Sequence, residues 1–317
     1  MADRLSVVIR RSPLRLAIAA TATAVALSGC ATFTDADVLA QSGDDDITND
    51  EFDPLADEYF ANPDVFGTTP VEAGRANADQ TRILLGVMVR QLLINQFLDA
   101  NDVDPTPARQ EFEEIALADS QVAELSDDMR ALVVDTAEQP RNEALALIQP
   151  PSADELGTLY NDHPPSTGVT CIRHILVDTE ADGDDVLDEL ASGADFATLA
   201  VERSTDPTAV DNGGAIADVD NECVSLQTVL QGFDPGFTAG VLLGTAGVPS
   251  GPYESSFGWH VIMHRPWDEV GDSVVALHQQ GESGVLLFDG FASTAEVTID
   301  PRMGAWDPVA ASVVAVG

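Results

Sequence analysis

The sequence predicts an α+β protein, in which a helical module is followed by a smaller domain with an antiparallel sheet. Apolar residues recur at three- and four-residue steps between residues 80 and 98, which is the period of a packed helix. Two short runs, 171–177 and 257–263, are rich in residues that prefer strands. Residues 295–300 alternate polar and apolar side chains, which predicts one more strand. At 317 residues the chain has room for about two domains of ~150 residues.

The charge of the chain excludes one class of partner. All 14 basic residues are arginine, and the formal net charge is −40 at pH 7. Residues 1–29 hold four arginines and one aspartate, so the rest of the chain carries ten arginines and 53 acidic residues. Such a surface repels phosphate backbones, so we expect no nucleic-acid binding. A saline habitat or a solubility bias explains the acidity as well as an acidic functional surface does.

Residues 1–29 are predicted to be a secretory signal. An arginine-bearing start precedes the apolar run from Leu16 to Leu27, which is too short for an ordinary transmembrane helix. The run ends in Leu27-Ser28-Gly29-Cys30, which resembles the bacterial lipobox. That resemblance implies lipidation of Cys30, which would anchor an exported protein to the outer face of the cell membrane. The alternative is a plain signal peptide with an incidental cysteine.

Residues 31–70 allow two interpretations. Their acidic composition, including Asp44-Asp45-Asp46, is typical of a solvated tether. However, Val38-Leu39-Ala40 followed by residues 47–52 indicates a strand, a turn and the start of a helix, with Thr48 or Asn49 as its cap. We favour the second interpretation.

The region after residue 70 is predicted to be a helical body. Helices are expected over residues 80–98, 108–117, 127–148 and 153–160, and a further helix of about ten residues is expected after Pro266. The body is either an ordinary bundle or an apolar cradle that holds unfolded segments. The run from Glu111 to Glu114 is interpreted as a solvated helix face rather than a carboxylate pair for acid–base chemistry.

The stretch from Cys171 to Arg265 carries a series of short motifs in a fixed order. They are Arg173-His174-Ile175-Leu176-Val177, residues 193–200, Ser204-Thr205-Asp206, Gly213-Gly214, Phe233 with Phe237, Gly251-Pro252, and residues 257–262. None is diagnostic alone, but their order resembles the parvulin family of peptidyl-prolyl isomerases over roughly the whole stretch. The resemblance implies a small antiparallel sheet flanked by helices.

The regions on either side of this stretch resemble SurA-like chaperones. In that family a short strand and a helix precede a helical body, and the C-terminal segment returns to complete the N-terminal domain. The resemblance implies the following organisation: signal peptide 1–29, lipid-anchored tether 30–36, SurA-like helical domain 37–165, parvulin-type domain 166–266, and a C-terminal helix and strand, 267–317, that pack back on the N-terminal domain. Residues 302–306 would form a turn against that module.

The parvulin resemblance also implies the site residues. His174 and His260 match the paired histidines at the floor of the family's cleft, and Asp206 matches the position of Cys or Asp beside the substrate amide. Phe233 and Phe237, spaced to face the same way on a helix, match the proline pocket. Phe257 would wall that pocket and Ser255 would offer a hydroxyl group. The alternatives are satisfied core histidines, core aromatic residues, and an ordinary turn where Asp206 precedes Pro207.

Two features depart from the family, and the state of two cysteines is open. Ala215-Ile216-Ala217 replaces the usual Asp-Leu-Gly after Gly213-Gly214, which removes backbone freedom near the site. No counterpart of the basic cluster for phosphorylated substrates is present, so phospho-Ser-Pro specificity is not expected. Cys171 and Cys223 would form a disulfide in an exported protein, or would remain two thiols.

We therefore expect an extracytoplasmic, membrane-anchored foldase that isomerises Xaa-Pro bonds in unfolded or partly folded exported polypeptides and holds them as a chaperone. One alternative is a non-catalytic chaperone that keeps the parvulin fold only as a peptide-binding surface. Another is a structural or solute-binding lipoprotein. No metal site or cofactor fingerprint is present in the sequence, and none is expected. The oligomeric state is open.

Overall fold

The computed structural model describes residues 37–69 and 76–316 of the chain. The expected signal peptide, the lipidation site Cys30 and the tether as far as residue 36 lie outside the described residues.

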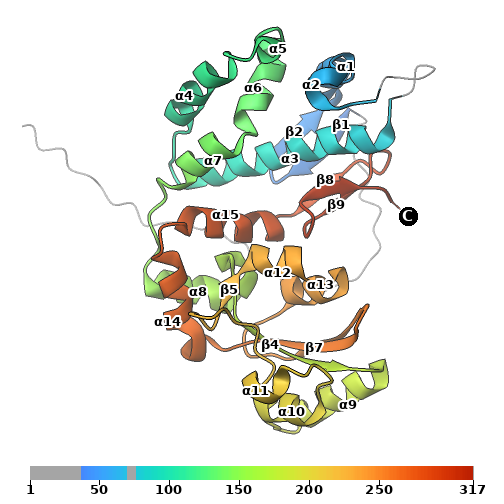
Figure 1. Cartoon of the computed structure of the whole chain (residues 1–317), viewed down its shortest axis with the longest axis vertical. Coiled ribbons are helices and arrows are strands. Elements are labelled where there is room, and N and C mark those ends of the chain that lie inside the picture. The colour runs from blue at the N-terminus through green and yellow to red at the C-terminus, as the bar shows by residue number, and fades with distance from the viewer. Residues whose placement is uncertain (1–36, 70–75, 317) are drawn as a thin grey trace, which may run out of the picture. The chain divides into compact units, whose positions relative to one another are not determined.

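Both ends of the described chain meet in one sheet. Strand β1 (Val38–Ser42) pairs with β2 (Asp45–Thr48) and, on its other edge, with β8 (Val297–Ile299). Ala40 lies opposite Ile299 in this antiparallel pair. Figure 1 shows the blue and red ends of the colour scale side by side there. The expectation that the C-terminal segment completes the N-terminal domain is confirmed, and the tether interpretation is wrong for the described part of residues 31–70.

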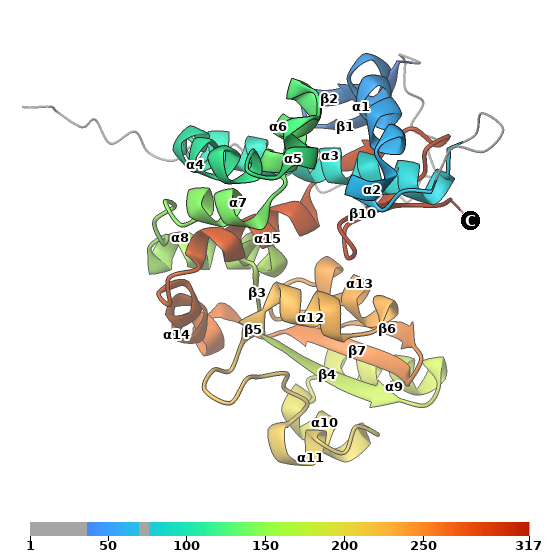
Figure 2. The same ribbon diagram turned by 45° about the horizontal axis from the view of Figure 1, so that its top comes forward.

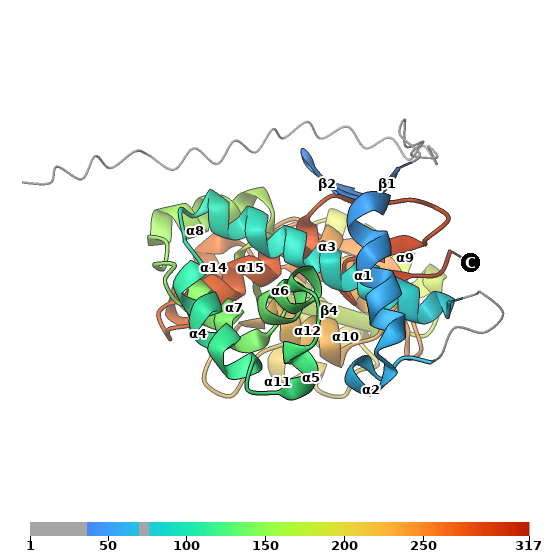
Figure 3. The ribbon, with the colours of Figure 1, turned by 90° about the horizontal axis from the view of Figure 1, so that it is seen from above.

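Helix α1 (Asn49–Ala61) begins where the sequence indicated. Thr48 is the N-cap, and its backbone N–H and hydroxyl donate to the Glu51 carboxylate at 2.9 and 2.8 Å. This exchange satisfies polar groups that a helix start leaves without partners. In Figure 3, α1 crosses α3 (Ala78–Ala100), which is the expected helix over residues 80–98.

Helix α3 is the core of the helical module. By length and composition it could cross a membrane, but one face is buried against the sheet and α15. The module also contains α2 (Pro63–Phe66), α4 (Thr106–Ala116), α5 (Ser120–Ala123), α6 (Asp127–Asp135) and α7 (Glu138–Leu145). The single helix expected over residues 127–148 is wrong. Pro140 has no N–H and its ring would clash with the carbonyl of Thr136, so the helix breaks at 136–137.

The C-terminal region contains more elements than expected. Two helices follow Pro266, namely α14 (Trp267–His278) and α15 (Ser283–Thr294), where one was expected. Residues 302–306 do not form a turn alone, because β9 (Ala305–Asp307) begins there and pairs with β10 (Ser312–Val314). Trp306 packs on the core of the helical module as expected. Helix α15 packs on α3, on α7 and on the 3-10 turn η1 (Pro164–Thr167) that follows α8 (Ala153–Asp162).

The second sheet has the order β4-β7-β6 and is antiparallel throughout. Its strands are β4 (Ile172–Val177), β6 (Ser250–Ser255) and β7 (Gly258–His264). Helices α9 (Glu180–Ala191) and α10 (Phe196–Arg203) cover one face, and α12 (Leu226–Gly232) and α13 (Pro235–Leu243) pack on the other face (Figure 2). The short helix α11 (Ala209–Asn212) follows α10. The small antiparallel sheet flanked by helices is thus confirmed.

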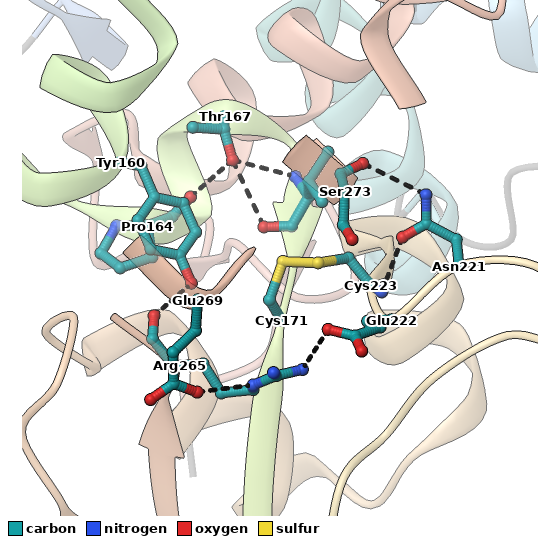
Figure 4. The surroundings of a disulfide bond; sticks show 11 residues. Tyr160, Pro164, Thr167, Cys171, Asn221, Glu222, Cys223, Arg265, Glu269 and Ser273 are labelled. Atoms are coloured by element: carbon teal, nitrogen blue, oxygen red, sulfur yellow. Dashed lines mark hydrogen bonds and ion pairs between the residues drawn. A yellow bond between two sulfur atoms is a disulfide. The ribbon is translucent and has the colours of Figure 1, made fainter. Parts of the chain in front are cut away.

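A disulfide joins two segments of this region. Cys171 lies between β3 (Val169–Thr170) and β4, and Cys223 directly precedes β5 (Val224–Ser225), which pairs with β3. The structure bonds these cysteines, with their Cα atoms 4.4 Å apart. Both are fully buried, and Figure 4 shows the bond beside Tyr160 and Arg265.

Candidate functional site

The two candidate histidines lie on neighbouring strands and on the same face of the sheet. Residues alternate between faces along a strand, so His174 on β4 lies on the side of Ile172, and His260 on β7 lies on the side of Ile262. His260 pairs with Leu176 rather than with His174, so the two histidines are diagonal neighbours. Their Nδ1 atoms are 3.3 Å apart, and both side chains are buried.

Asp206 lies on the loop after α10 and holds the outer nitrogen of His174. The distance from His174 Nε2 to Asp206 Oδ2 is 3.1 Å. The other carboxylate oxygen accepts the backbone N–H and the hydroxyl of Thr208 at 2.9 and 2.8 Å. Burial alone would raise the pKa of Asp206, but the bonds from Thr208 and the contact with His174 outweigh it and lower the pKa. Asp206 is therefore a carboxylate at neutral pH, and it can only accept hydrogen bonds.

Ser255 holds the outer nitrogen of the second histidine. It ends β6, and the two-residue turn Ser256–Phe257 brings the chain back into β7. Its Oγ lies 2.8 Å from Nε2 of His260 and accepts the backbone N–H of Phe257 at 3.1 Å.

Burial sets the charge of both histidines. Desolvation lowers the pKa of His174, although Asp206 opposes the shift. Desolvation, followed by the proximity of His174, lowers the pKa of His260 to about 4. At neutral pH both imidazoles are therefore neutral, and each has one donor and one acceptor nitrogen.

These charges allow one consistent order of protons. The carboxylate of Asp206 requires a proton on Nε2 of His174, so Nδ1 of His174 accepts. Nδ1 of His260 must then donate to it, which leaves Nε2 of His260 to accept the hydroxyl proton of Ser255. The order runs from Ser255 through His260 and His174 to Asp206, and it satisfies every ring nitrogen.

The aromatic residues pack beside this chain of hydrogen bonds. Phe237 is 1 % exposed, and its ring lies nearly perpendicular to both imidazoles, with centroids 5.5 Å from His174 and 5.0 Å from His260. Phe233 stacks on Phe237 at 4.9 Å and is 38 % exposed. The two phenylalanines were expected on one helix. Instead Phe233 follows α12, and Pro235 begins α13, because Asp234 between them is the N-cap.

We call these six residues the His–Phe cluster: His174, Asp206, Phe233, Phe237, Ser255 and His260. Phe257, which was expected to wall the same pocket, is 76 % exposed at the tip of the β6–β7 turn, and that role stays a prediction. Two polar supports were not foreseen, Thr208 and Asp234. Thr208 follows Asp206 by two residues, which is the spacing of an Asx turn, and Asp234 precedes a proline, a common helix start.

Ala217 stands where the family has a glycine after the Gly-Gly turn, and the backbone bonds between this segment and β4 are still formed. The backbone N–H of His174 donates to the carbonyl of Gly214 at 2.8 Å, and that of Ile216 donates to Ile172 at 3.1 Å. Gly213 and Gly214 have positive φ angles, whereas Ala215, Ile216 and Ala217 do not. The turn therefore does not require a glycine at residue 217.

Two other features of the described residues bear on ligand binding. Within residues 37–69 and 76–316, no group of three or more His, Cys, Asp or Glu side chains could hold a metal ion. A hollow of about 330 Å³ lies between α3 and β10, lined in part by Arg82 and Arg90, and it includes no residue of the His–Phe cluster.

Comparison with known proteins identifies the region around the cluster. Residues 174–265 match the family described as Rotamase: PPIC-type PPIASE domain. The foldase protein PrsA of Caldanaerobacter subterraneus subsp. tengcongensis is 31% identical over 126 residues, which are 38% of this chain and 38% of that protein. The foldase protein PrsA of Clostridium kluyveri is 40% identical over 91 residues, 29% of this chain and 25% of that protein. The chain therefore spans well under half of the length of these relatives.

Solved structures show a weaker likeness. NmPin, the parvulin of Nitrosopumilus maritimus, has 24% identity and a TM-score of 0.26, and the match covers 31% of this chain and 96% of that one. PrsA from Bacillus subtilis has 18% identity and a TM-score of 0.28, and covers 81% and 91%. One of two SurA-like chaperones of Campylobacter jejuni, PEB4 and Cj1289, has 21% identity and a TM-score of 0.25, and covers 78% and 92%. At these scores the solved structures add nothing to the assignment of residues 174–265.

Proposed function

Residues 174–265 belong to the rotamase family of PPIC-type PPIASE domains, and on this premise we propose that the chain accelerates cis–trans isomerisation of Xaa-Pro bonds. The observation that carries the proposal is the ordered hydrogen-bond chain from Ser255 to Asp206 beside the rings of Phe233 and Phe237.

Prolyl isomerisation neither forms nor breaks a covalent bond. Rotation about the amide has a barrier of about 18–20 kcal/mol, and catalysis requires tighter binding of the twisted amide than of either planar form. The partly exposed ring of Phe233, which stacks on the buried ring of Phe237, offers an apolar contact for the pyrrolidine ring. The neutral, fixed imidazoles keep that surface rigid, and the Asp206 carboxylate supplies a fixed charge beside it.

The chain around this domain fits a foldase. The two relatives named above are foldase proteins, and we extend that role to this chain as part of the proposal. In the proposed organisation, the helical module 37–165, closed by residues 267–317, holds unfolded or partly folded exported polypeptides that contain proline. The rotamase domain then spans residues 166–266, the leader exports the chain, and a lipid on Cys30 anchors it to the outer face of the membrane.

An isomerase assay on short Xaa-Pro peptides tests the activity. With soluble protein that starts after Cys30, we expect acceleration that His260→Ala and Phe237→Leu each reduce at least about tenfold. The first variant breaks the hydrogen-bond chain between Ser255 and His174, and the second removes the ring that supports Phe233. Phe196→Leu is the matched control. Phe196 is buried on the opposite face of the sheet, so the same substitution there should lower stability without a comparable loss of rate.

Two outcomes would count against the activity. A well-folded wild type that accelerates no peptide sinks the catalytic proposal, and if it still suppresses client aggregation the non-catalytic chaperone becomes the better account. Equal losses in Phe196→Leu and Phe237→Leu would mean that the aromatic contact at the cluster has no special part in the rate.

The membrane anchor has its own test. We expect the full chain, expressed in a bacterium that lipidates exported proteins, to fractionate with membranes, and Cys30→Ala to be released into the soluble extracytoplasmic fraction. Cys30 follows an apolar run and small residues, which is the basis for this expectation. Membrane association that is unchanged in Cys30→Ala would show that another feature holds the protein there.

A further inference from the structure

Asp234 connects the two segments that carry the aromatic and the polar halves of the His–Phe cluster. Its Oδ1 accepts the backbone N–H of Gly236 at 3.2 Å, as the N-cap of α13. Its Oδ2 accepts the backbone N–H of Ser256 at 3.1 Å, in the turn between β6 and β7. One carboxylate thus bridges the start of the helix that holds Phe237 and the hairpin that holds Ser255.

The bridge lies where the start of α13 packs directly against the end of β6. Gly236 packs so closely on β6 that a Cβ atom at this position would lie 1.7 Å from the carbonyl oxygen of Glu254. Glu254 directly precedes Ser255, and Gly236 directly precedes Phe237. The bond from Ser256 to Asp234 therefore fixes the hairpin at the point where it meets the helix.

The same turn determines the position of the Ser255 hydroxyl. Ser255 Oγ accepts the backbone N–H of Phe257 and donates to Nε2 of His260. Ser256, between them, is the residue that Asp234 holds. A turn that moves away from Asp234 would carry Phe257 N–H with it and would weaken the alignment of Ser255 with His260.

We propose that Asp234 is a positioning residue for the isomerase: it holds the β6–β7 turn against α13, so that Ser255 keeps its bond to His260 beside the Phe233–Phe237 stack. Asp234 makes no hydrogen bond to either imidazole among the described residues. Its charge raises the pKa of His260, but burial still holds that pKa at about 4, so the imidazole is neutral at pH 7 with or without the charge and the positioning role depends on the turn. This inference rests on the proposed function, and it adds a residue that the parvulin-like motifs did not single out.

The test separates capping from bridging. Asp234→Ser keeps a good N-cap for α13 but is too short to reach Ser256, and Asp234→Asn keeps the size and the cap but loses the second acceptor oxygen. The matched control is Asp195→Ser, because Asp195 caps α10 in the same domain through Thr198 and has no bond to the hairpin in the described hydrogen bonds. All three variants should fold with similar melting temperatures.

Three measurements follow on each variant: kcat/KM on an Ala-Pro peptide, amide hydrogen exchange at Ser256, and the ¹⁵N shift of His260 Nε2. For Asp234→Ser and Asp234→Asn we expect kcat/KM to fall about tenfold, because small displacements of site groups cost rates of that order or more. Exchange at Ser256 should become faster and the Nε2 shift should change as its bond to Ser255 weakens. Asp195→Ser should match the wild type in all three.

Some results would overturn the inference. They are wild-type exchange at Ser256 in both Asp234 variants, an unchanged His260 shift, or a loss of rate no larger than in Asp195→Ser. If the wild type accelerates no peptide, the proposed function fails, and with it the positioning role in catalysis. The exchange at Ser256 and the His260 shift need no turnover, so they would still show whether Asp234 holds the turn even if the protein is not an isomerase.

Discussion

Removal of the disulfide between Cys171 and Cys223 is expected to lower the free energy of unfolding by about 4 kcal/mol. The bond closes a loop of 52 residues. In the chain-entropy account a cross-link of this length lowers the conformational entropy of the unfolded chain, which raises its free energy by about 4 kcal/mol. A loss of this size is a large fraction of the 5–15 kcal/mol that typically stabilises a domain. The measurement is urea unfolding of the soluble chain with and without a reductant.

The matched control is the double variant Cys171→Ala/Cys223→Ala. It should unfold at nearly the same urea concentration as the reduced wild type, and a reductant should not change it further. If a reductant leaves the urea midpoint of the wild type unchanged, the prediction is contradicted, because the bond that closes the 52-residue loop would then add nothing to the free energy of unfolding.

The structure indicates which part of the molecule would loosen first. Without the bond, the segment before β5 is still held by Asn221, whose side chain donates to the carbonyl of Ser273, and by the ion pair of Glu222 with Arg265 (Figure 4). Glu222 is largely exposed, so this pair contributes little in water. That segment leads into α12 and the phenylalanines, so reduction is expected to affect the His–Phe cluster as well as stability.

Much of the fold followed from local patterns. The two histidine strands, α3 and the start of α1 were visible in alternation, period and capping residues. Helix α15 was not, because it contains two glycines and several residues of low helix propensity. The structure shows the reason for the glycines. A Cβ at Gly284 would lie 2.0 Å from the carbonyl oxygen of Leu145, and one at Gly290 would lie 2.4 Å from that of Ser166. The residues that weaken the helix locally are the ones that let it pack.

In the candidate site, too, local features could be predicted from the sequence and long-range features could not. Side chains within a motif could be predicted, because their positions on a strand or before a proline follow from short spacings. The order of protons could not, because it depends on distances between His174 and His260, 86 residues apart, and on the burial that keeps both neutral. The bridge made by Asp234 likewise joins residues 22 positions apart, so the Asp234-Pro235 pair could have indicated the helix cap but not the bond to Ser256.

Acid is expected to destabilise the protein at pH values where ordinary carboxylates are still charged. Burial lowers the pKa of His260, His264 and His278 to about 4, whereas an unfolded chain would hold each near 6.5. Between these values the unfolded chain binds protons that the folded chain does not, so stability falls as the pH falls. From pH 7 to pH 5 the loss is about 2 kcal/mol for each of the three histidines.

Between pH 7 and pH 5 ordinary carboxylates remain charged, and the repulsion among them changes little. Asp289 is the exception, because burial raises its pKa to about 6, so the folded chain takes up a proton there and part of the loss from the histidines is offset. His264→Gln gives the sharpest comparison. His264 is fully buried and its Nε2 lies 2.8 Å from the carbonyl oxygen of Val241, a bond that a glutamine amide can also donate. Because glutamine does not titrate, the loss of stability between pH 7 and pH 5, measured by urea unfolding, should be about 2 kcal/mol smaller in His264→Gln than in the wild type. An unchanged slope in His264→Gln would show that this histidine is protonated in the folded state already, and would remove burial as the cause of the acid sensitivity.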